Sequence, residues 1–244
     1  MSPAAALLRS LDELRGRLAP LPFAPPVAHV YNPLAFAWPV VQQYMTRYAH
    51  AKPKAILLGM NPGPFGMVQT GIPFGEIRAV RDWMGLDAPI TAPALQHPKR
   101  PITGWATTRS EVSGARLWGW AAARYGSAEA FFHDFFVLND CPLAFLGPTG
   151  ANLTPDKLPK SETAALFAAC DTALAQCVGV LQPQWVIGVG GFAQTCAQRV
   201  VATLPATGRP QIGQILHPSP ASPAANRGWA QQVDAELVKL GILS

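Results

Sequence analysis

The stretch that decides the fold is AILLGMNPGPFGMVQTGIPFG, residues 55–75. Its first five residues form a short apolar run, as expected for a β-strand that is buried on both faces of a sheet. Proline and glycine then recur between residues 62 and 75 at a density that no helix or strand tolerates. A shaped loop therefore leaves the carboxyl end of a strand, which is where open α/β sheets bind their ligands.

The loop offers few side chains for specific contacts. Asn61 supplies an amide, Phe74 supplies a ring that we expect to be exposed, and the glycines let a ligand approach the backbone. The alternative is a plain strand-to-helix connection. Such connections usually run about 2–6 residues, and this one is much longer. We therefore interpret residues 61–75 as part of a binding site.

Composition limits the class of protein. The chain has 244 residues, is 49% hydrophobic and 14% charged, and carries a net charge of +5. These values predict a single globular domain over residues 1–244 and are compatible with a polyanionic partner. We expect no membrane span, because no run of eighteen apolar residues is present. We also expect that the first twenty residues are not a signal peptide, because charged residues interrupt any apolar core there.

The cysteines give no sign of a metal site. Cys141, Cys170, Cys177 and Cys196 form no CxxC pair, so we expect free thiols and no bound metal.

Apolar segments alternate with helical patterns along the chain. Strands are predicted at 55–59, 135–138, 184–189 and 213–217. Helices are predicted at 4–18, 42–50, 76–86, 112–125, 162–180, 192–204 and 228–240, with Asn226 as the cap of the last one. Residues 19–54 form an ordered covering segment, and 87–109 and 144–160 form loops. The alternation predicts an α/β fold of three layers, α/β/α, around a central four-stranded parallel sheet.

Three polar side chains follow strands of this sheet. Asn61, Asn139 and His217 each stand at a carboxyl end, and parallel strands bring those ends to one edge. Each residue alone has an ordinary explanation as a turn former or loop residue beside proline. Their combination predicts a site at which two amides and an imidazole meet.

Two other features have open alternatives. His97–Pro101 is either a basic loop that faces phosphates or a solvated surface loop. Gly190-Gly191 either holds a phosphate at a helix N-terminus or forms a tight turn, and the tight turn is the better explanation.

Residues 59–67, 69–75, 112–116, 152–155 and 217–220 together resemble the single-strand-selective monofunctional uracil-DNA glycosylases. The resemblance extends from about residue 30 to residue 243. It implies the uracil-DNA glycosylase fold, no metal or cofactor, and hydrolysis of uracil from DNA to leave an abasic site in base excision repair. No lysine is placed to form a Schiff base, so we expect base release without strand cleavage.

The resemblance also implies roles for individual residues. Asn61 would position the attacking water, Phe74 would stack on the flipped base, Asn139 would read the uracil edge, and His217 would lie beside uracil O2. Met60 and Gly63 would also contact the base.

A further expectation concerns Gly63 and the space beside the base. The glycine would leave room around C5, so we expect tolerance of 5-substituted uracils such as 5-hydroxymethyluracil. Thymine would be rejected if an ordered water occupies that space.

The resemblance places residues 218–228 in a loop that enters the duplex. Pro218, Ser219, Pro220 and Ala221 would contact DNA, with Arg227 nearby. Ala221 replaces the arginine usual in the family, so this wedge is weakened. We expect a monomer that acts on single- and double-stranded DNA containing uracil. We expect it in the cytoplasm of a prokaryote or the nucleus of a eukaryote.

Three other functions compete with this one. A hydrolase could use Ser219 as nucleophile and His217 as base, although the G-x-S-x-G elbow is missing. A non-catalytic nucleotide- or DNA-binding module could use the Gly190-Gly191 turn. A glycosylase of the same fold could act mainly on hypoxanthine or xanthine.

Overall fold

A four-stranded parallel sheet forms the centre of the computed structural model, which describes residues 1–50 and 52–244. Its strands are β2 (Ala55–Gly59), β3 (Phe135–Asn139), β6 (Trp185–Val189) and β7 (Gln211–Ile215), in the order β3-β2-β6-β7. All neighbouring pairs are parallel, as predicted. The fourth strand ends at Ile215, so His217 lies two residues beyond it in the following loop.

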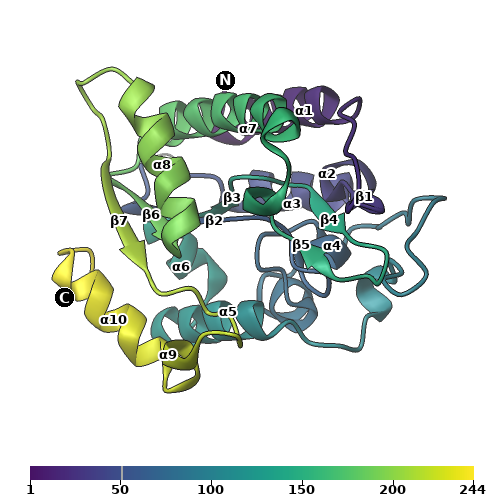
Figure 1. Cartoon of the computed structure of the whole chain (residues 1–244). Coiled ribbons are helices and arrows are strands. Elements are labelled where there is room, and N and C mark those ends of the chain that lie inside the picture. Colours follow the sequence, from purple (N-terminus) through teal and green to yellow (C-terminus); the bar gives the residue numbers. More distant parts are fainter. Residues whose placement is uncertain (51) are drawn as a thin grey trace.

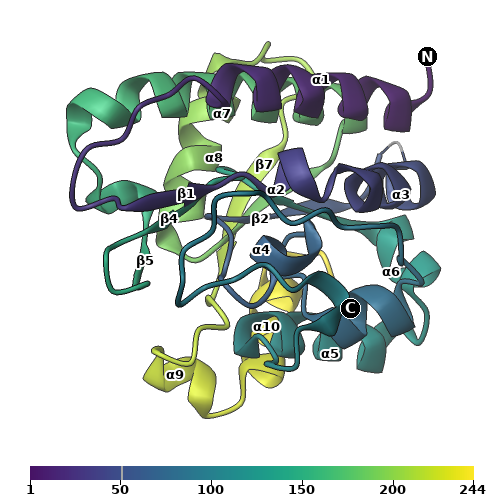
Figure 2. The same cartoon turned by 90° about the vertical axis from the view of Figure 1, so that its right-hand side faces the viewer.

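Helices cover both faces of the sheet, which confirms the three-layer prediction (Figure 1). One face carries α1 (Pro3–Leu18), α3 (Trp38–Tyr48), α7 (Lys160–Leu181) and α8 (Gly191–Thr203). The other face carries α5 (Val112–Tyr125), α6 (Ala128–Asp134) and α10 (Trp229–Lys239). Figure 2 shows the same layers from the side, with α1 and α7 above the sheet and α5 and α10 below it.

The burial pattern explains why these segments fold as they do. Every residue of β2 is buried, as a central strand covered on both faces requires. On α1, the predicted stripe of Leu7, Leu11, Leu14 and Leu18 is buried, and Ser2 caps the helix by accepting a hydrogen bond from the Ala5 N–H.

Helix α7 departs from one expectation. By length and composition it could cross a membrane, although the sequence suggested no such segment. In the structure it packs against α1 and α8, and residues along its length such as Leu166, Leu174 and Leu181 are buried. This is the environment of a core helix.

A second, antiparallel sheet was not predicted. It consists of β1 (His29–Tyr31), β4 (Ala144–Leu146) and β5 (Asn152–Leu153), in the order β1-β4-β5. The strands are too short to show alternation in the sequence, so residues 144–160 had suggested only a loop. This sheet also places Asn152 at the rim of the site described below.

Several shorter elements also differ from expectation. The helix predicted at 76–86 is mostly a π-helical turn, η1 (Ala79–Trp83). The remaining short elements are α2 (Pro33–Phe36), α4 (Met67–Thr70), α9 (Pro223–Asn226), η2 (Gly104–Ala106) and η3 (Pro155–Lys157).

Asn226 does not cap the last helix. Gly228 occupies the position before α10, while the Asn226 amide accepts a hydrogen bond from Arg116 and donates one to the Pro220 carbonyl. The prediction failed because tertiary contacts, not the adjacent helix, satisfy this side chain.

Candidate active site

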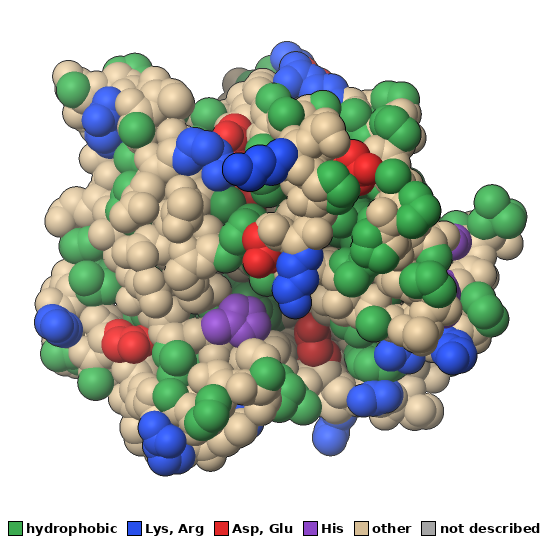
Figure 3. Space-filling view, in the orientation of Figure 1, with side chains coloured by type: hydrophobic (Ala, Val, Ile, Leu, Met, Phe, Trp, Pro, Cys, Tyr) green, Lys and Arg blue, Asp and Glu red, His purple; other side chains and the backbone are tan. Residues whose placement is uncertain are grey.

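A cavity of about 280 Å³ opens at the carboxyl ends of the parallel strands. Figure 3 shows the face of Figure 1 with a central hollow, a histidine beside it and basic side chains at several points around it. The cavity is lined by Met60, Asn61, Gly63, Pro64, Phe74, Glu111, Ser113, Asn139, Asn152, Thr154, His217 and Ser219. The predicted meeting of Asn61, Asn139 and His217 is therefore confirmed.

Phe74 is buried, not exposed as expected, with only 8% of its surface accessible. Its ring lies over Gly59, where an added Cβ would come within 2.7 Å of the ring. Its backbone is held at a φ of +53°, a strained value for a residue with a side chain. The Trp118 Nε1–H donates to the Phe74 carbonyl at 2.9 Å and helps to hold this conformation. The ring is thus fixed as one wall of the cavity.

Asn139, at the end of β3, has an unused hydrogen-bond acceptor. Its Nδ2 donates to the Met67 sulfur at 3.2 Å, whereas its buried Oδ1 has no partner among the described residues. A Cβ on Gly59 would lie 2.2 Å from that Oδ1, so only glycine fits there. An unsatisfied buried acceptor is costly unless a ligand supplies the missing donor.

The imidazole of His217 is held in one orientation. The Ser219 N–H donates to its Nδ1 at 3.1 Å, so the neutral ring carries its proton on Nε2. Burial lowers the pKa of His217 below its ordinary value, which favours this neutral form at pH 7. The ring centroid lies 6.0 Å from that of Phe74. His217 is therefore a neutral N–H donor at the cavity wall.

The surroundings of His217 argue against a serine nucleophile. The Ser219 hydroxyl accepts from the Ala221 N–H, and no hydrogen bond joins it to His217 among the described residues, so a Ser–His nucleophile pair is not formed. Gly190 has a φ of +91°, and its Cα faces the Cβ of His217. Gly190 is the N-cap of α8 and by itself connects β6 to that helix.

Asn61 lies two residues beyond the end of β2. Its Nδ2 makes a long hydrogen bond of 3.5 Å to the Leu143 carbonyl. The Oδ1 remains available to accept a hydrogen bond from a small molecule in the cavity, because it is not the atom used in that contact.

Glu111 was missed by the sequence interpretation. It stands at the N-cap position of α5, but its side chain does not cap the helix. Its carboxyl group lies against the loop after Asn61, because a Cβ on Gly63 or Gly66 would come within 1.8 Å of its oxygens. Burial, with a smaller contribution from Glu76, raises the pKa of Glu111 to about 7. Its Oε2 has no hydrogen-bond partner among the described residues.

This arrangement changes the meaning of Gly63. The sequence suggested that glycine leaves open space beside the base. The structure shows that the space nearest the Gly63 Cα holds the Glu111 carboxyl group. The only sequence signal was an acidic N-cap residue directly before the 112–116 motif.

The loop expected to contact DNA is held in place from α5. Arg116 donates to the carbonyls of Pro218 and Ser219 at 3.1 and 3.3 Å, and to the Asn226 amide at 2.7 Å. Ala221 and Arg227 are exposed on this loop, whereas Pro218 is buried. Arg116 lies in the 112–116 motif, but the sequence predicted no role for it.

A basic pocket adjoins the active-site cavity, and Pro64 lines both. It measures about 220 Å³, and the guanidinium groups of Arg109 and Arg100 lie 4.1 and 5.4 Å from the centre of the Phe65 ring. Lys99 also lines it, and the lining that the structure describes contains no acidic side chain. His97 of the same loop is instead buried, and its backbone N–H donates to the Tyr31 hydroxyl.

Comparison with known proteins agrees with this geometry. The sequence profile of the uracil DNA glycosylase superfamily matches residues 46–237. A single-strand selective monofunctional uracil-DNA glycosylase of Rattus norvegicus is 45% identical over 253 residues, which cover 99% of this chain and 90% of that protein. Its Bos taurus counterpart is 46% identical over 236 residues, which cover 97% and 85%.

A solved structure supports the fold. The crystal structure of SMUG2 from Pedobacter heparinus matches with a TM-score of 0.71 and 18% identity, covering 99% of this chain and 97% of that one.

Proposed function

The chain belongs to the uracil-DNA glycosylase superfamily and, within it, to the single-strand selective monofunctional enzymes, and we propose that it hydrolyses uracil from DNA. The observation that carries the proposal is the shared cavity of Asn61, Asn139 and His217. Its donors and acceptors match the groups that a uracil base presents.

The base must leave the DNA stack to reach this cavity. Extrusion costs a few kcal/mol and is easiest from a single strand or a mismatch. Stacking on a fixed aromatic ring returns about 1–3 kcal/mol, and Phe74 supplies such a ring already held in position.

Asn139 distinguishes uracil from cytosine. Its unpartnered Oδ1 accepts from N3–H of uracil, and its Nδ2 donates to O4. Cytosine presents the opposite pattern and leaves buried groups unsatisfied, which discriminates strongly. The Met67 sulfur supports the required amide orientation by accepting from Nδ2.

His217 stabilises the leaving group. When the glycosidic bond breaks, the electron pair goes to uracil, and negative charge develops on O2 and N1. The Nε2–H of a neutral, oriented His217 stabilises this charge more in the transition state than in the ground state.

Asn61 completes the hydrolysis. The departing base leaves an oxocarbenium ion at C1′ of the sugar, and water adds to that carbon. Asn61 takes no proton at ordinary pH, so it orients the water through its Oδ1. A weak nucleophile suffices because the electrophile is already cationic.

The surface around the cavity fits a DNA strand. The pocket formed by Phe65, Lys99, Arg100 and Arg109 offers positive charge and an aromatic face beside the site. On the loop ordered by Arg116, the exposed Ala221 presents only a methyl group. A small residue there is a weak wedge, which supports a preference for single-stranded DNA over duplex.

Incubation with single-stranded DNA containing one uracil tests the proposal. Alkali treatment should cleave the strand at the uracil position, while untreated DNA stays intact, because the enzyme releases the base without cutting the backbone. Free uracil should appear in equal amount. Intact DNA after alkali would contradict the proposed function.

A further inference from the structure

We propose that Glu111 is a specificity residue that reads the substituent at C5 of the base and favours groups that donate a hydrogen bond. The inference rests on the proposed function and extends it from uracil to its 5-substituted derivatives. It is carried by the position of the Glu111 carboxyl group and by its missing hydrogen-bond partner.

The roles of the other site residues leave one edge of the pyrimidine ring for Glu111. Asn61 lies beside the bond from N1 to the sugar, His217 donates to O2, and Asn139 contacts N3 and O4. C5 and C6 are left for the rest of the lining. The loop after Asn61 supplies Gly63 to that lining, and the Glu111 carboxyl group fills the space beside it.

Three glycines hold the carboxyl group there. Added Cβ atoms at Gly63 and Gly66 would come within 1.8 Å of its oxygens, and one at Gly114 within 3.1 Å. Such close approach by the 63–66 loop and by the first turn of α5 leaves the carboxyl group little freedom. The Oε1 atom is the one beside Gly63, which lines the cavity, whereas the buried Oε2 lies against Gly66 and Gly114. Among the described residues Oε2 has no hydrogen-bond partner, so the protein does not satisfy this carboxyl group on its own.

The chemistry of a carboxylate then decides which substituents it favours. An ionised carboxylate only accepts hydrogen bonds, so it pairs with the hydroxyl of 5-hydroxymethyluracil. A formyl oxygen also only accepts and faces it unfavourably. The methyl group of thymine would desolvate the carboxylate without a compensating hydrogen bond.

Titration of Glu111 should therefore change the selectivity. The group's pKa of about 7 is raised first by burial and then by Glu76, whose carboxylate accepts from the Ala79 N–H. His217 lines the same cavity as a neutral ring.

The neighbouring arginines have other partners. Arg109 lies over Phe65, and Arg116 binds the carbonyls of Pro218 and Ser219. Protonated Glu111 can donate a hydrogen bond to a formyl oxygen, so it no longer favours the 5-hydroxymethyl group over the 5-formyl group. Ionised Glu111 only accepts hydrogen bonds and therefore favours the 5-hydroxymethyl group.

The test compares single-turnover release of uracil, 5-hydroxymethyluracil and 5-formyluracil from one single-stranded sequence. In the wild type, the ratio of the 5-hydroxymethyl rate to the 5-formyl rate should rise with pH through about 7. In Glu111→Gln the ratio at pH 8 should fall about 10- to 100-fold, as expected for loss of a hydrogen bond to a charged group, and its pH dependence should flatten. The ratio of the 5-hydroxymethyl rate to the uracil rate should fall as well, so the uracil rate of the same variant serves as the internal reference.

Two further variants act as controls. Glu76→Gln retains an oxygen for the Ala79 N–H and removes the neighbouring charge, so the rise in the ratio should move to lower pH. Glu111→Asp retracts the carboxylate and should give an intermediate ratio. It replaces Glu111→Gln if that variant does not fold.

Two results would overturn the inference. One is wild-type rates on all three bases in the Glu111 variants, and the other is an equal loss on all three, which would leave the ratio unchanged and indicate a general catalytic or structural role. Failure of the wild type to release uracil would instead refute the proposed function itself.

Discussion

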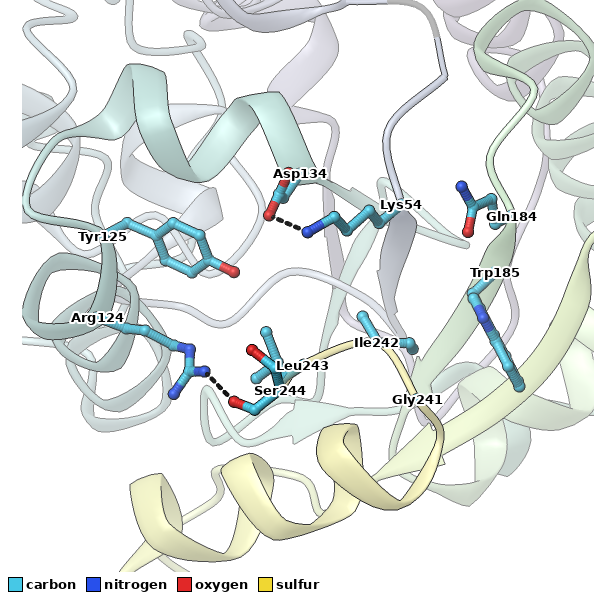
Figure 4. Close-up of a pocket in the computed structure, with 10 residues that line it drawn as sticks. All are labelled: Lys54, Arg124, Tyr125, Asp134, Gln184, Trp185, Gly241, Ile242, Leu243 and Ser244. Atoms are coloured by element: carbon cyan, nitrogen blue, oxygen red, sulfur yellow. Dashed lines mark hydrogen bonds and ion pairs between the residues drawn. The ribbon is translucent and has the colours of Figure 1, made fainter.

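The two ends of the parallel sheet carry pockets of opposite character. At the amino ends, Lys54, Asp134 and Gln184 precede β2, β3 and β6 and line a pocket of about 630 Å³ (Figure 4). At the carboxyl ends lies the cavity of about 280 Å³ that contains Asn61 and His217. The larger pocket is not the one whose chemistry matches a base.

The difference lies in how far each end satisfies its own polar groups. At the amino end, Lys54 donates to Asp134 at 2.8 Å, and Arg124 pairs with Asp234 at 3.2 Å. At the carboxyl end, the Oδ1 of Asn139 and the Oε2 of Glu111 are buried without partners among the described residues. Unused hydrogen-bonding capacity, more than size, therefore distinguishes a site built for a ligand.

Replacing His217 with Leu should give the largest difference between the two ends. Loss of one donor to a developing anion typically slows the chemical step about 10²- to 10³-fold. Asp134→Asn weakens an ion pair at the amino end and should leave the rate nearly unchanged. Single-turnover uracil release measures both variants. Equal effects of the two substitutions would remove the functional distinction between the ends.

Glu111→Gln should show how much the buried Glu111 carboxylate lowers the free energy of unfolding. The pKa of Glu111 is higher in the folded protein than its ordinary value of 4.5, so the folded state binds the proton more tightly than the unfolded chain does. The resulting stabilisation is complete below about pH 4.5 and is lost as the pH rises to about 7. The total loss is roughly 3 kcal/mol.

Urea unfolding of the wild type and Glu111→Gln across this pH range measures the effect. The free energy of unfolding of the wild type should fall relative to that of the variant between pH 4.5 and 8. A constant difference would show that the carboxyl group is not strained by its burial.

Met67→Leu should have the smallest effect. Leucine keeps the apolar contact of this buried residue and removes the sulfur that accepts from Asn139. Loss of one weak hydrogen bond corresponds to about a 2- to 5-fold slower release of uracil. Cytosine-containing DNA should also become a better competitor, because the amide can turn. An unchanged rate and unchanged competition would mean that another contact orients Asn139.

Much of the fold could be predicted from the sequence because its signals are local. The buried runs at β2 and β3 and the leucine stripe of α1 each occupy one short segment. The small sheet was missed because β4 has three residues and β5 has two, too few to show a pattern. The position of Asn226 depended on Arg116, which is remote in sequence.

The site could be predicted only in part for the same reason. Asn61 and Asn139 mark strand ends, and the order of strands brings them together. Phe74 was expected to be exposed because no local pattern shows that Gly59 makes room for its ring. Glu111 enters the site through contacts with Gly63 and Gly66 of a remote loop, and sequence periodicity does not report such contacts.

The most direct test of the account is the single-turnover rate of uracil release by Asn61→Ala, measured together with its affinity for DNA. If Asn61 orients the attacking water in a cavity shared with Asn139 and His217, release should be abolished while DNA affinity and the unfolding temperature stay close to those of the wild type. Wild-type release by this variant, or loss of its folding, would contradict the central claim that these side chains form one catalytic site for a flipped uracil.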